Sequence, residues 1–211
     1  MENNLDKSIA FFDFDGTITS KDTLAEIIKF AKGKANYYKG LLFLMPILVS
    51  YKTKLLSNHR AKEILMQYFF HGTDANAFNE ICNQFTKEKL PSLIRKQALK
   101  EIYKHQRNNT KIVVVSASPV NWVSPWCKQL NIECIATHLE VRHEKITGKI
   151  LGRNCSGEEK VNCIKAKYNL TEFSKIYAYG DTAGDLPMLA LSTHKFYKPF
   201  KEKIKKAKEV Y

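Results

Sequence analysis

The sequence lacks the cysteine spacing of a disulfide framework or a zinc site. Its five cysteines form an odd set that contains no CxxC pair, whereas small disulfide-rich domains and zinc sites use paired, closely spaced cysteines. We therefore expect a reduced, cytoplasmic protein without structural disulfides. The residues are Cys82, Cys127, Cys134, Cys155 and Cys163.

The sequence also lacks an apolar run that is long enough to cross a membrane. Its longest run, residues 41–49 (LLFLMPILV), falls well short of the ~20 residues that span a bilayer. The first eight residues, MENNLDKS, are polar, so no secretory leader is expected. A transmembrane helix is not expected either, whereas a helix that lies on a membrane surface stays open.

Acidic residues are scarce relative to basic ones. The chain has 21 Asp and Glu against 34 Lys and Arg, which gives a formal net charge of +13, and such a charge attracts anions. Otherwise, 44% hydrophobic and 26% charged residues over 211 positions are typical of a globular protein with a core, which excludes the disordered and fibrous classes. This length favours one domain, or one domain with a sizeable insertion.

Three short apolar runs have the composition of buried strands, and each ends in small polar or acidic residues. They cover residues 8–14, 111–115 and 175–179. Helical patterns stand between them, so we predict an α/β fold with a doubly wound parallel sheet. Ligands of such sheets bind beyond the carboxyl ends of the strands, where these polar turns lie. The helical patterns cover residues 22–32, with Asp22 as the N-cap, and residues 78–89, 91–105 and 158–168.

One long stretch breaks the alternation of strands and helices. Residues 20–90 are mostly helical in pattern and contain no good strand, so we predict an all-helical cap inserted after the first strand. The catalytic core would then comprise residues 1–19 and 91–211. Residues 132–150 are expected to add a strand and a short hairpin around Thr147-Gly148.

Paired carboxylates follow the first and third predicted strands. In the segment DFDGT, Asp13 and Asp15 should share one side of an extended strand end, because alternate side chains point the same way. At ~4 Å and an effective dielectric constant near 20, their repulsion is about 4 kcal/mol, so a cation or a shared proton must compensate it. The segment GDTAGD adds Asp181 and Asp185. An all-oxygen donor set of this kind indicates Mg²⁺.

Two further residues could bind an anion at this edge of the sheet. Ser116 offers a hydroxyl and neighbouring backbone N–H groups at a strand end. Lys160, at the start of a helical pattern, could supply the positive charge that a phosphoryl group needs. Lys165 and Lys167 are alternatives for that charge, and a solvated helix face would also explain all three lysines. The acid Asp185 would equally suit the N-terminus of a helix.

Taken together, these segments resemble a known family. DFDGT, VVVSAS, Lys160 and GDTAGD are similar, in order and spacing, to the four motifs of the haloacid dehalogenase-like (HAD) hydrolases. The helical insertion between the first two motifs resembles subfamily IB, which contains phosphoserine phosphatase. The cap and the sequence SASP also resemble phosphatidylglycerophosphatases of the C type. Phosphoserine phosphatases usually have Ser-Gly-Gly there and a glutamate in place of Asp22.

The resemblance implies a role for each acidic residue. Asp13 would be the nucleophile that becomes an aspartyl phosphate. Asp15 would protonate the leaving alcohol and then activate water. Mg²⁺ would be held by Asp13, by the main-chain carbonyl of Asp15 and by Asp181. Asp185 would act through water or by orienting Lys160.

The resemblance also implies a set of substrate-binding residues. Ser116, the Ala117 amide and Lys160 would surround the phosphoryl oxygens, and Arg60 could bind a substrate carboxylate as in phosphoserine phosphatases. Ion-pumping relatives have threonine at the position of Asp15 and preserve their phosphoenzyme. Asp15 therefore favours phosphomonoester hydrolysis.

The predicted cap has a charge pattern that catalysis does not require. No Asp occurs between residues 27 and 62, nor any Glu, while basic residues flank the apolar run 41–49. Basic edges around an apolar centre suit a segment on an anionic membrane surface; a cap core with solvated lysines is the alternative. The basic residues are Lys29, Lys32, Lys34, Lys39, Lys52, Lys54, Arg60 and Lys62, and the tail from Lys195 adds seven lysines against two glutamates.

The sequence thus predicts a Mg²⁺-dependent phosphatase for a small or lipid-linked phosphomonoester such as phosphatidylglycerophosphate, with phosphoserine as the alternative substrate. An alternative function of another class is an inactive scaffold that binds a phosphorylated ligand or nucleic acid through its positive charge. Such a module would not need both Asp13 and Asp15, and no specific nucleic-acid site is expected. The expected location is cytoplasmic, either free or peripheral to the inner face of the membrane. Nothing in the sequence indicates the oligomeric state.

Overall fold

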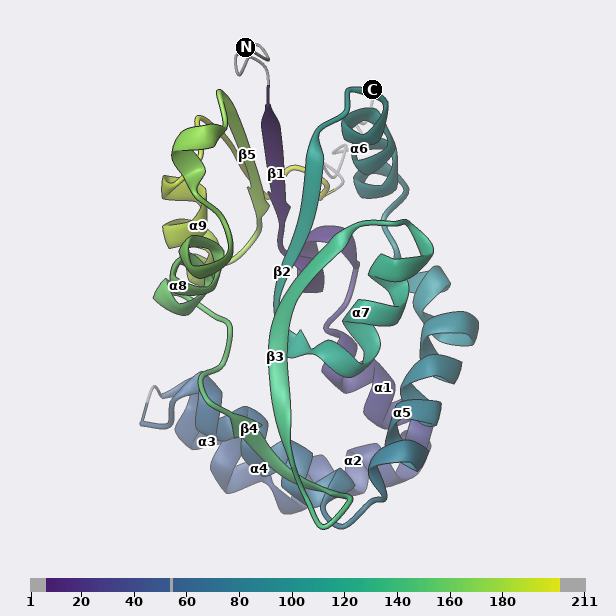
Figure 1. Ribbon diagram of the computed structural model, residues 1–211. Helices are drawn as coiled ribbons and strands as arrows, with labels where there is room; N and C mark the ends of the chain where they lie inside the picture. The colour runs from purple at the N-terminus through teal and green to yellow at the C-terminus, as the bar shows by residue number, and fades with distance from the viewer. Residues whose placement is uncertain (1–6, 54, 202–211) are drawn as a thin grey trace, which may run out of the picture.

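The computed structural model describes residues 7–53 and 55–201, apart from the side chain of Lys52 (Figure 1). The strands are β1 (Ser8–Phe12), β2 (Lys111–Pro119), β3 (Glu133–Arg142), β4 (Lys145–Leu151), β5 (Lys175–Gly180) and β6 (His194–Tyr197). The helices are α1 (Thr23–Lys32), α2 (Lys34–Phe43), α3 (Met45–Lys52), α4 (Asn58–Phe70), α5 (Ala75–Gln84), α6 (Lys96–Arg107), α7 (Val120–Gln129), α8 (Glu158–Lys167) and α9 (Leu186–Ala190).

The strands form one sheet in the order β4-β3-β2-β1-β5-β6. β1 pairs in parallel with both β2 and β5, and only β4 runs antiparallel to its neighbour β3 among the described strands. The predicted α/β fold with a mostly parallel sheet is confirmed. Because the strand order reverses at β1, its carboxyl end lies at the switch point where ligands of such sheets bind.

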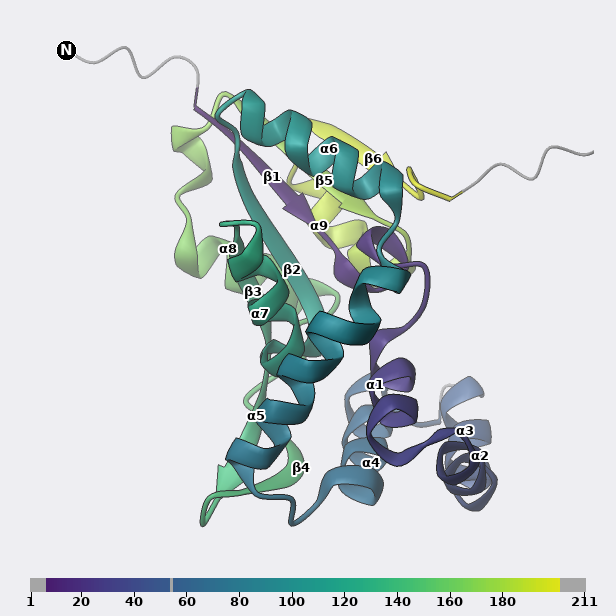
Figure 2. The same ribbon diagram turned by 90° about the vertical axis from the view of Figure 1, so that its right-hand side faces the viewer.

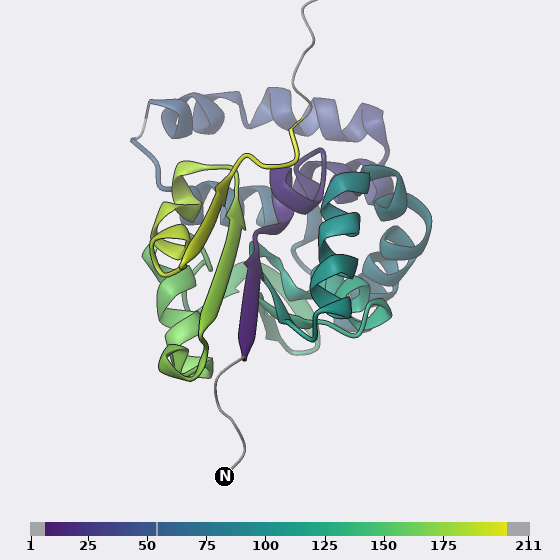
Figure 3. The same cartoon turned by 90° about the horizontal axis from the view of Figure 1, so that it is seen from above.

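Helices cover both faces of the sheet (Figure 3). Successive side chains of β1 point to opposite faces, so Ile9 and Phe11 pack in the core formed with α8 and α9, while Ala10 and Phe12 pack in the core formed with α6 and α7. Burial on both faces explains why β1 has an uninterrupted apolar sequence rather than an alternating one.

The first strand is shorter than the sequence predicted. β1 ends at Phe12, and the segment Phe14–Ile18 forms a tight turn in which Asp15 and Gly16 have non-helical backbone angles, so the strand expected to continue through residue 14 is wrong there. Phe14 is nevertheless fully buried, which is why the apolar run extends past the strand. Gly16 has φ +86°, and a Cβ at this position would lie 2.7 Å from a carboxylate oxygen of Asp181. The turn therefore requires glycine both for its conformation and for its space.

Helices α1 to α4 lie beyond the carboxyl edge of the sheet (Figures 1 and 2). Asp22 caps α1 as predicted, since its side chain accepts a hydrogen bond from the Ala25 amide at 3.1 Å. α5 continues through the turn Phe85–Lys89 toward α7, where the Thr86 hydroxyl donates to the Trp122 carbonyl at 3.2 Å. Among the described residues, no helix has both the length and the apolar character that crossing a bilayer requires.

The hairpin β3–β4 reaches from the sheet to helix α4 (Figure 1). The amide of Ile150 donates to the Glu63 carboxylate at 3.1 Å. The hairpin turns at His143-Glu144, which have positive φ angles of 47° and 61°, so the turn expected around Thr147-Gly148 is wrong. The hairpin, which lies outside residues 20–90 in the sequence, thus packs against a helix of that segment. The division into a core of residues 1–19 and 91–211 and a cap of residues 20–90 stays a prediction.

Candidate active site

The centre of the site is a buried lysine between two aspartates. Asp13 follows β1, and its side chain is buried. Lys160 Nζ, in the first turn of α8, lies 2.6 Å from Asp13 Oδ1 and 2.7 Å from Asp185 Oδ1. Lys165 and Lys167 are exposed on the same helix, and only Lys160 comes to the acidic residues.

The loop after β5 holds Asp185 in a fixed orientation. Asp185 Oδ2 accepts hydrogen bonds from the Asp181 amide at 3.1 Å and from the Thr182 amide and hydroxyl at 2.9 and 2.8 Å. Asp181 in turn accepts a hydrogen bond from the Thr17 hydroxyl at 3.3 Å, and its other oxygen lies 3.1 Å from Lys201 Nζ. Both carboxylates are buried, so the loop presents fixed oxygen atoms toward Asp13.

The donor set of this site fits a hard divalent cation. Carboxylate oxygens of Asp13, Asp181 and Asp185 lie within 4.8 Å of one another, and all three residues are buried. Within the described chain, Lys160 is the only buried cation that pairs with them, which leaves an excess of negative charge in a place where unpaired charge is costly. Oxygen-only ligands with this excess suit Mg²⁺ rather than zinc.

Asp13 and Lys160 shift each other's pKa. Burial raises the pKa of Asp13 to about 7, Lys160 opposes this shift and Asp185 adds to it. Burial lowers the pKa of Lys160, but the carboxylates of Asp13 and Asp185 outweigh burial and raise it above its usual range. Lys160 therefore stays positively charged throughout the neutral range.

Asp15 points to different partners from those of Asp13. Asp15 Oδ1 accepts hydrogen bonds from the Thr23 amide and hydroxyl, both at 2.6 Å, and Oδ2 accepts one from the Ser118 hydroxyl at 2.6 Å. Its carboxylate lies outside the cluster of three acids. The two aspartates are thus compensated separately rather than by one shared cation, because the chain leaves the extended conformation between them.

The surroundings of Asp15 favour its protonated form. Burial raises the pKa of Asp15 and the charge of Asp22 adds to this, while hydrogen bonds from Ser118 and Thr23 oppose it. A raised pKa and a fixed orientation suit a carboxyl group to both donating and accepting a proton.

The carboxyl end of β2, which extends past the predicted residue 115 to Pro119, lies next to Asp15. Ser116 is fully buried, and its hydroxyl accepts a hydrogen bond from the Ser118 amide at 2.9 Å. Ala117 is half-buried. Ser118 links this end of β2 to Asp15, so the carboxyl ends of β1 and β2 meet at one place.

Lys62 is a residue of this site that the sequence interpretation missed. From α4, its Nζ donates to the Ala117 carbonyl at 2.6 Å and to Asn154 Oδ1 at 3.2 Å. Burial lowers the pKa of Lys62, although Asp15 and Asp22 raise it. The sequence interpretation counted Lys62 only within the basic flank of the apolar run, because nothing local distinguishes it from its neighbours.

Arg60 does not lie with these groups. Its guanidinium is half-exposed and donates to Glu63 Oε2 at 3.0 Å. Residues two apart point to different sides of a helix, so α4 directs Lys62 toward the site and Arg60 away from it. The predicted contact of Arg60 with a substrate carboxylate finds no support in this placement.

Sequence comparison relates the chain to known proteins. Residues 10–190 match the model of a family described as haloacid dehalogenase-like hydrolase. The chain is 31% identical to protein CicA of Caulobacter vibrioides over 194 residues, which covers 91% of this chain and 86% of that protein. It is 28% identical to "Probable phosphatase Rv3661" of Mycobacterium tuberculosis over 199 residues, which covers 89% of this chain and 67% of that protein.

Comparison with solved structures supports the fold. A phosphoserine phosphatase solved as an analogue of its phospho-aspartyl intermediate superimposes with a TM-score of 0.61 over 90% of this chain and 85% of that chain. The two sequences are 19% identical, so the likeness concerns the fold.

Proposed function

Because the chain belongs to the haloacid dehalogenase-like hydrolases and is a phosphatase, we propose that it hydrolyses phosphomonoesters with Mg²⁺ through a phosphoaspartyl intermediate. One observation carries the proposal above all others. Lys160 Nζ lies within 2.7 Å of both Asp13 and Asp185, and Asp181 completes a buried cluster of oxygen atoms. This arrangement joins a nucleophile, a fixed positive charge and a metal-binding acid group.

Asp13 is the proposed nucleophile. Its carboxylate attacks phosphorus, the bond from phosphorus to the leaving alcohol breaks, and an aspartyl phosphate forms. Asp13, Asp181 and the main-chain carbonyl of Asp15 would hold Mg²⁺, with Asp185 in support. When bound, the ion would neutralise negative charge on the phosphoryl group.

Asp15 is the proposed general acid and base. In the first step it gives its proton to the oxygen of the leaving alcohol, and in the second it takes a proton from the water that attacks the aspartyl phosphate. Its raised pKa supports the first role. Thr23 and Ser118 hold both of its oxygens at 2.6 Å, so they act as positioning residues.

The phosphoryl oxygens would lie between the carboxyl end of β2 and two lysines. Ser116, the Ala117 amide and Lys160 are the proposed partners of these oxygens. We add Lys62, because its Nζ is bonded only to neutral oxygen atoms at Ala117 and Asn154. A doubly charged phosphate would then contact two cations, Lys160 from α8 and Lys62 from α4.

An apolar cavity favours a lipid-linked leaving group. It has a volume of about 300 Å³, and Asp22 at its edge directly precedes Thr23, which holds Asp15. Phosphoserine would instead require Arg60 to leave Glu63. We therefore propose a lipid-linked phosphomonoester such as phosphatidylglycerophosphate as the substrate, with phosphoserine as the second candidate. The apolar residues of the cavity are Leu24, Ala25, Ile28, Leu41, Leu48 and Leu65.

The chemistry is tested by removing the nucleophile or the metal. We expect the protein to hydrolyse p-nitrophenyl phosphate with Mg²⁺, and Asp13→Asn or EDTA to lower kcat by roughly 10³-fold or more. Added Mg²⁺ should restore activity after EDTA. Asp74→Asn is the matched control, because Asp74 caps α5 at the surface and asparagine caps helices equally well. Equal activity of Asp13→Asn and the wild type would refute the mechanism.

The substrate class is tested by comparing kcat/KM over a panel of phosphomonoesters. The panel contains phosphatidylglycerophosphate in detergent, phosphoserine, sugar phosphates, nucleotides and phosphocholine. A lipid-linked substrate should have the highest value. A preference for phosphoserine would overturn the substrate assignment and leave the mechanism intact, whereas no turnover of any phosphomonoester would favour an inactive binding scaffold.

A further inference from the structure

Helices α2 and α3 expose an unusual number of large apolar side chains. We define the α2–α3 face as Tyr38, Leu42, Phe43, Met45 and Val49, which are between 51% and 73% exposed. These residues overlap the run 41–49, for which the sequence left two interpretations. The exposures show that this run is not simply the core of the cap. Contiguous exposed apolar groups in a soluble protein mark an interaction surface.

The backbone fixes this face toward solvent. Tyr38 and Leu42 lie four residues apart on α2, and Met45 and Val49 lie four residues apart on α3, so each pair shares one side of its helix. The one residue between α2 and α3, Leu44, is buried and its amide donates to the Gly40 carbonyl at 2.9 Å.

The opposite side of α2 is packed tightly against α4. A Cβ at Gly40 would lie 2.4 Å from the ring of Phe69 and 2.7 Å from that of Tyr68. Only glycine allows this close approach. Because the inner side is locked in this way, the α2–α3 face cannot turn inward without breaking that contact.

Within residues 27–62, the charged residues around the α2–α3 face are all basic. No acidic residue occurs between positions 27 and 62, and Lys34 and Lys39 are exposed on α2. Lys54 and residues 202–211 lie outside the described part of the chain, and the side chain of Lys52 is not described. A surface that is apolar in its centre and basic at its edge complements anionic lipid headgroups above acyl chains.

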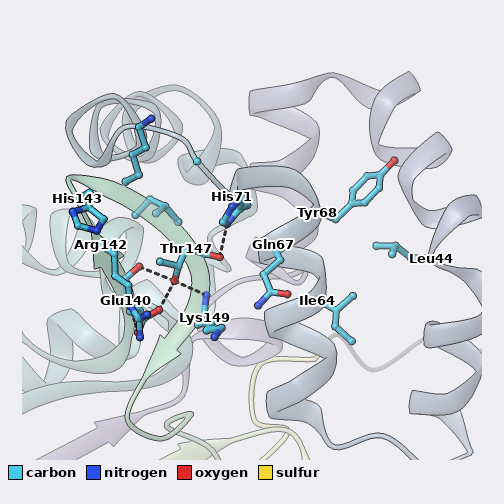
Figure 4. Close-up of a pocket in the computed structure, with 13 residues that line it drawn as sticks. Leu44, Ile64, Gln67, Tyr68, His71, Glu140, Arg142, His143, Thr147 and Lys149 are labelled. Atoms are coloured by element: carbon cyan, nitrogen blue, oxygen red, sulfur yellow. Dashed lines mark hydrogen bonds and ion pairs between the residues drawn. The ribbon is translucent and has the colours of Figure 1, made fainter.

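A basic groove adjoins the same face (Figure 4). It has a volume of about 1000 Å³ between α4 and the hairpin β3–β4, and three basic residues and one acidic residue line it: Arg142, Lys145, Lys149 and Glu140. Glu140 pairs with Arg142 at 2.7 Å, so the lining has a net positive charge. Tyr68 and Leu44 line its apolar side, and the Tyr68 ring stacks on Phe43 with the centroids 5.6 Å apart. The groove therefore continues the α2–α3 face and adds cations to its edge.

We propose that the α2–α3 face docks onto an anionic phospholipid bilayer, with its apolar side chains at the acyl boundary and the nearby lysines at the headgroups. The proposal deepens the proposed function, because a lipid-linked substrate would be presented at this face. A second copy of the chain is a poorer occupant, since two faces without acidic residues repel each other. The tail, residues 202–211, carries four lysines and two glutamates and offers no charge complement either.

The test is co-sedimentation of the full chain with vesicles. With vesicles of 30% phosphatidylserine in phosphatidylcholine at low salt, we expect most of the protein to pellet, and little with phosphatidylcholine alone. Raising the salt from 0.05 to 0.5 M should weaken binding, because exposed charges are screened beyond a few ångströms. Leu42→Ser with Phe43→Ser should reduce the partition coefficient by about tenfold or more, since two large apolar groups no longer enter the lipid.

Matched controls use an exposed face of α6, at the far end of the molecule (Figure 1). Tyr103→Ser removes an aromatic side chain that is 45% exposed and is the control for Leu42→Ser with Phe43→Ser. The double variant Lys96→Gln with Lys100→Gln is the control for Lys34→Gln with Lys39→Gln on α2. We expect the α6 variants to bind as the wild type does and the α2 variants to bind less. Hydrolysis of p-nitrophenyl phosphate should be the same in all of them, which verifies folding.

Each outcome separates docking from catalysis. Absence of vesicle binding in a protein that hydrolyses p-nitrophenyl phosphate would refute docking and leave the phosphatase proposal standing. Vesicle binding by a protein that lacks activity would refute only the phosphatase proposal. If Leu42→Ser with Phe43→Ser turned a dimer into a monomer in analytical ultracentrifugation without changing vesicle binding, the α2–α3 face would be an interface between copies and docking would be refuted.

Discussion

Lys62 is a half-buried cation whose hydrogen-bond partners are neutral. Its two hydrogen-bond acceptors are a backbone carbonyl and an asparagine side chain, and in the described part of the chain no carboxylate lies within ion-pair distance of its Nζ. A buried charge without a counter-charge is costly unless something compensates it. A phosphate dianion bound beside Asp15 would supply that compensation.

We expect Lys62→Met to raise KM for p-nitrophenyl phosphate by roughly 10- to 100-fold, because a hydrogen bond to a charged group is worth about 1.5–3 kcal/mol. The effect on kcat should be smaller. Thermal unfolding should not shift downward, since the variant no longer holds a half-buried charge without a counter-charge. Steady-state kinetics and a melting curve measure the two effects.

Lys100→Met on α6 is the control for Lys62→Met, because Lys100 is exposed and far from the site. Unchanged KM in both variants would contradict a role for Lys62 in binding the substrate. A rise in KM together with a loss of secondary structure would indicate that Lys62 is structural instead.

At the scale of residues, the sequence predicts the part of the site that lies in fixed motifs. Asp13, Lys160 and Asp185 meet as the order of the motifs suggested, while their catalytic roles stay predictions. Lys62 and Ser118 could not be predicted, because their contacts depend on how α4 lies over the carboxyl end of β2. The contact of Lys62 with Ala117 joins residues 55 apart in the chain, and no local pattern encodes it.

At the scale of elements, Gly148 is the point where β4 touches α4. A Cβ at Gly148 would lie 2.5 Å from both the backbone N and Cα of Gln67, and its φ is +78°. Gly152 has the same φ of +78° but nothing within 4 Å of such a Cβ. Substituting alanine at each glycine therefore distinguishes two contributions to the loss of stability: the left-handed backbone conformation, which both positions share, and the contact with α4, which only Gly148 makes.

We expect Gly152→Ala to lower the free energy of unfolding by roughly 1–2 kcal/mol, the cost of a left-handed alanine. Gly148→Ala should lower it by a further 1–3 kcal/mol or so, because the added methyl group meets backbone atoms that cannot move aside. Urea unfolding followed by circular dichroism measures both. Equal losses in the two variants would show that the hairpin can move away from α4 at little cost.

Gly148 also explains one error of the sequence interpretation. A Thr-Gly pair between apolar residues is typical of a hairpin turn, yet the turn lies at His143-Glu144 and the glycine makes room for a helix. The sequence shows that a glycine stands at this position, but not whether a turn or a close contact with another element requires it. The end of β1 was misplaced for a similar reason, because Phe14 is buried by the turn just as it would be by a strand.

At the scale of the whole molecule, Glu133 joins three elements of the fold. At the start of β3, its carboxylate lies 2.9 Å from Lys111 Nζ of β2 and 2.7 Å from Lys167 Nζ of α8, and it accepts a hydrogen bond from the Tyr168 hydroxyl at 2.7 Å. Burial by itself would raise the pKa of Glu133, but these three partners outweigh it and lower the pKa from 4.5 to about 2.

The contribution of Glu133 to stability should be measurable as the pH is lowered. Between pH 4.5 and about 2 the unfolded chain binds a proton at Glu133 that the folded protein does not, so the stability from this group is complete above pH 4.5 and is lost as the pH falls. We expect the free energy of unfolding of Glu133→Gln to fall less steeply than that of the wild type in this range. The difference should be modest, because the side chain is 37% exposed.

Urea titrations at pH 2.5, 3.5, 4.5 and 7 measure the pH dependence, and Glu88→Gln, at an exposed position, is the control. We expect the curve of Glu88→Gln to run parallel to that of the wild type. If the Glu133→Gln curve did so as well, the three partners of Glu133 would not hold its proton affinity down.

The fold class and the family follow from the sequence because the alternation of strands and helices and the order of the four motifs are local patterns that do not depend on tertiary packing. The fate of residues 41–49 does not follow, since an apolar run has the same composition whether it fills a core or faces solvent. Leu44 is 4% exposed and its neighbour Phe43 is 73% exposed. That difference arises from the way α2 and α3 lie on α4, which is a property of the assembled molecule.

The hairpin β3–β4 limits how the site can exchange its contents. The two connections between the sheet and α1–α5 are tied to each other, since the Ser20 amide donates to the Leu93 carbonyl at 2.7 Å and the Arg95 amide to the Ile18 carbonyl at 2.8 Å. The hairpin adds an anchor on another side. Opening of α1–α5 away from the sheet would therefore have to break the contacts of the hairpin with α4, or bend β3 where its pairing with β4 shifts, between Leu139 and Val141.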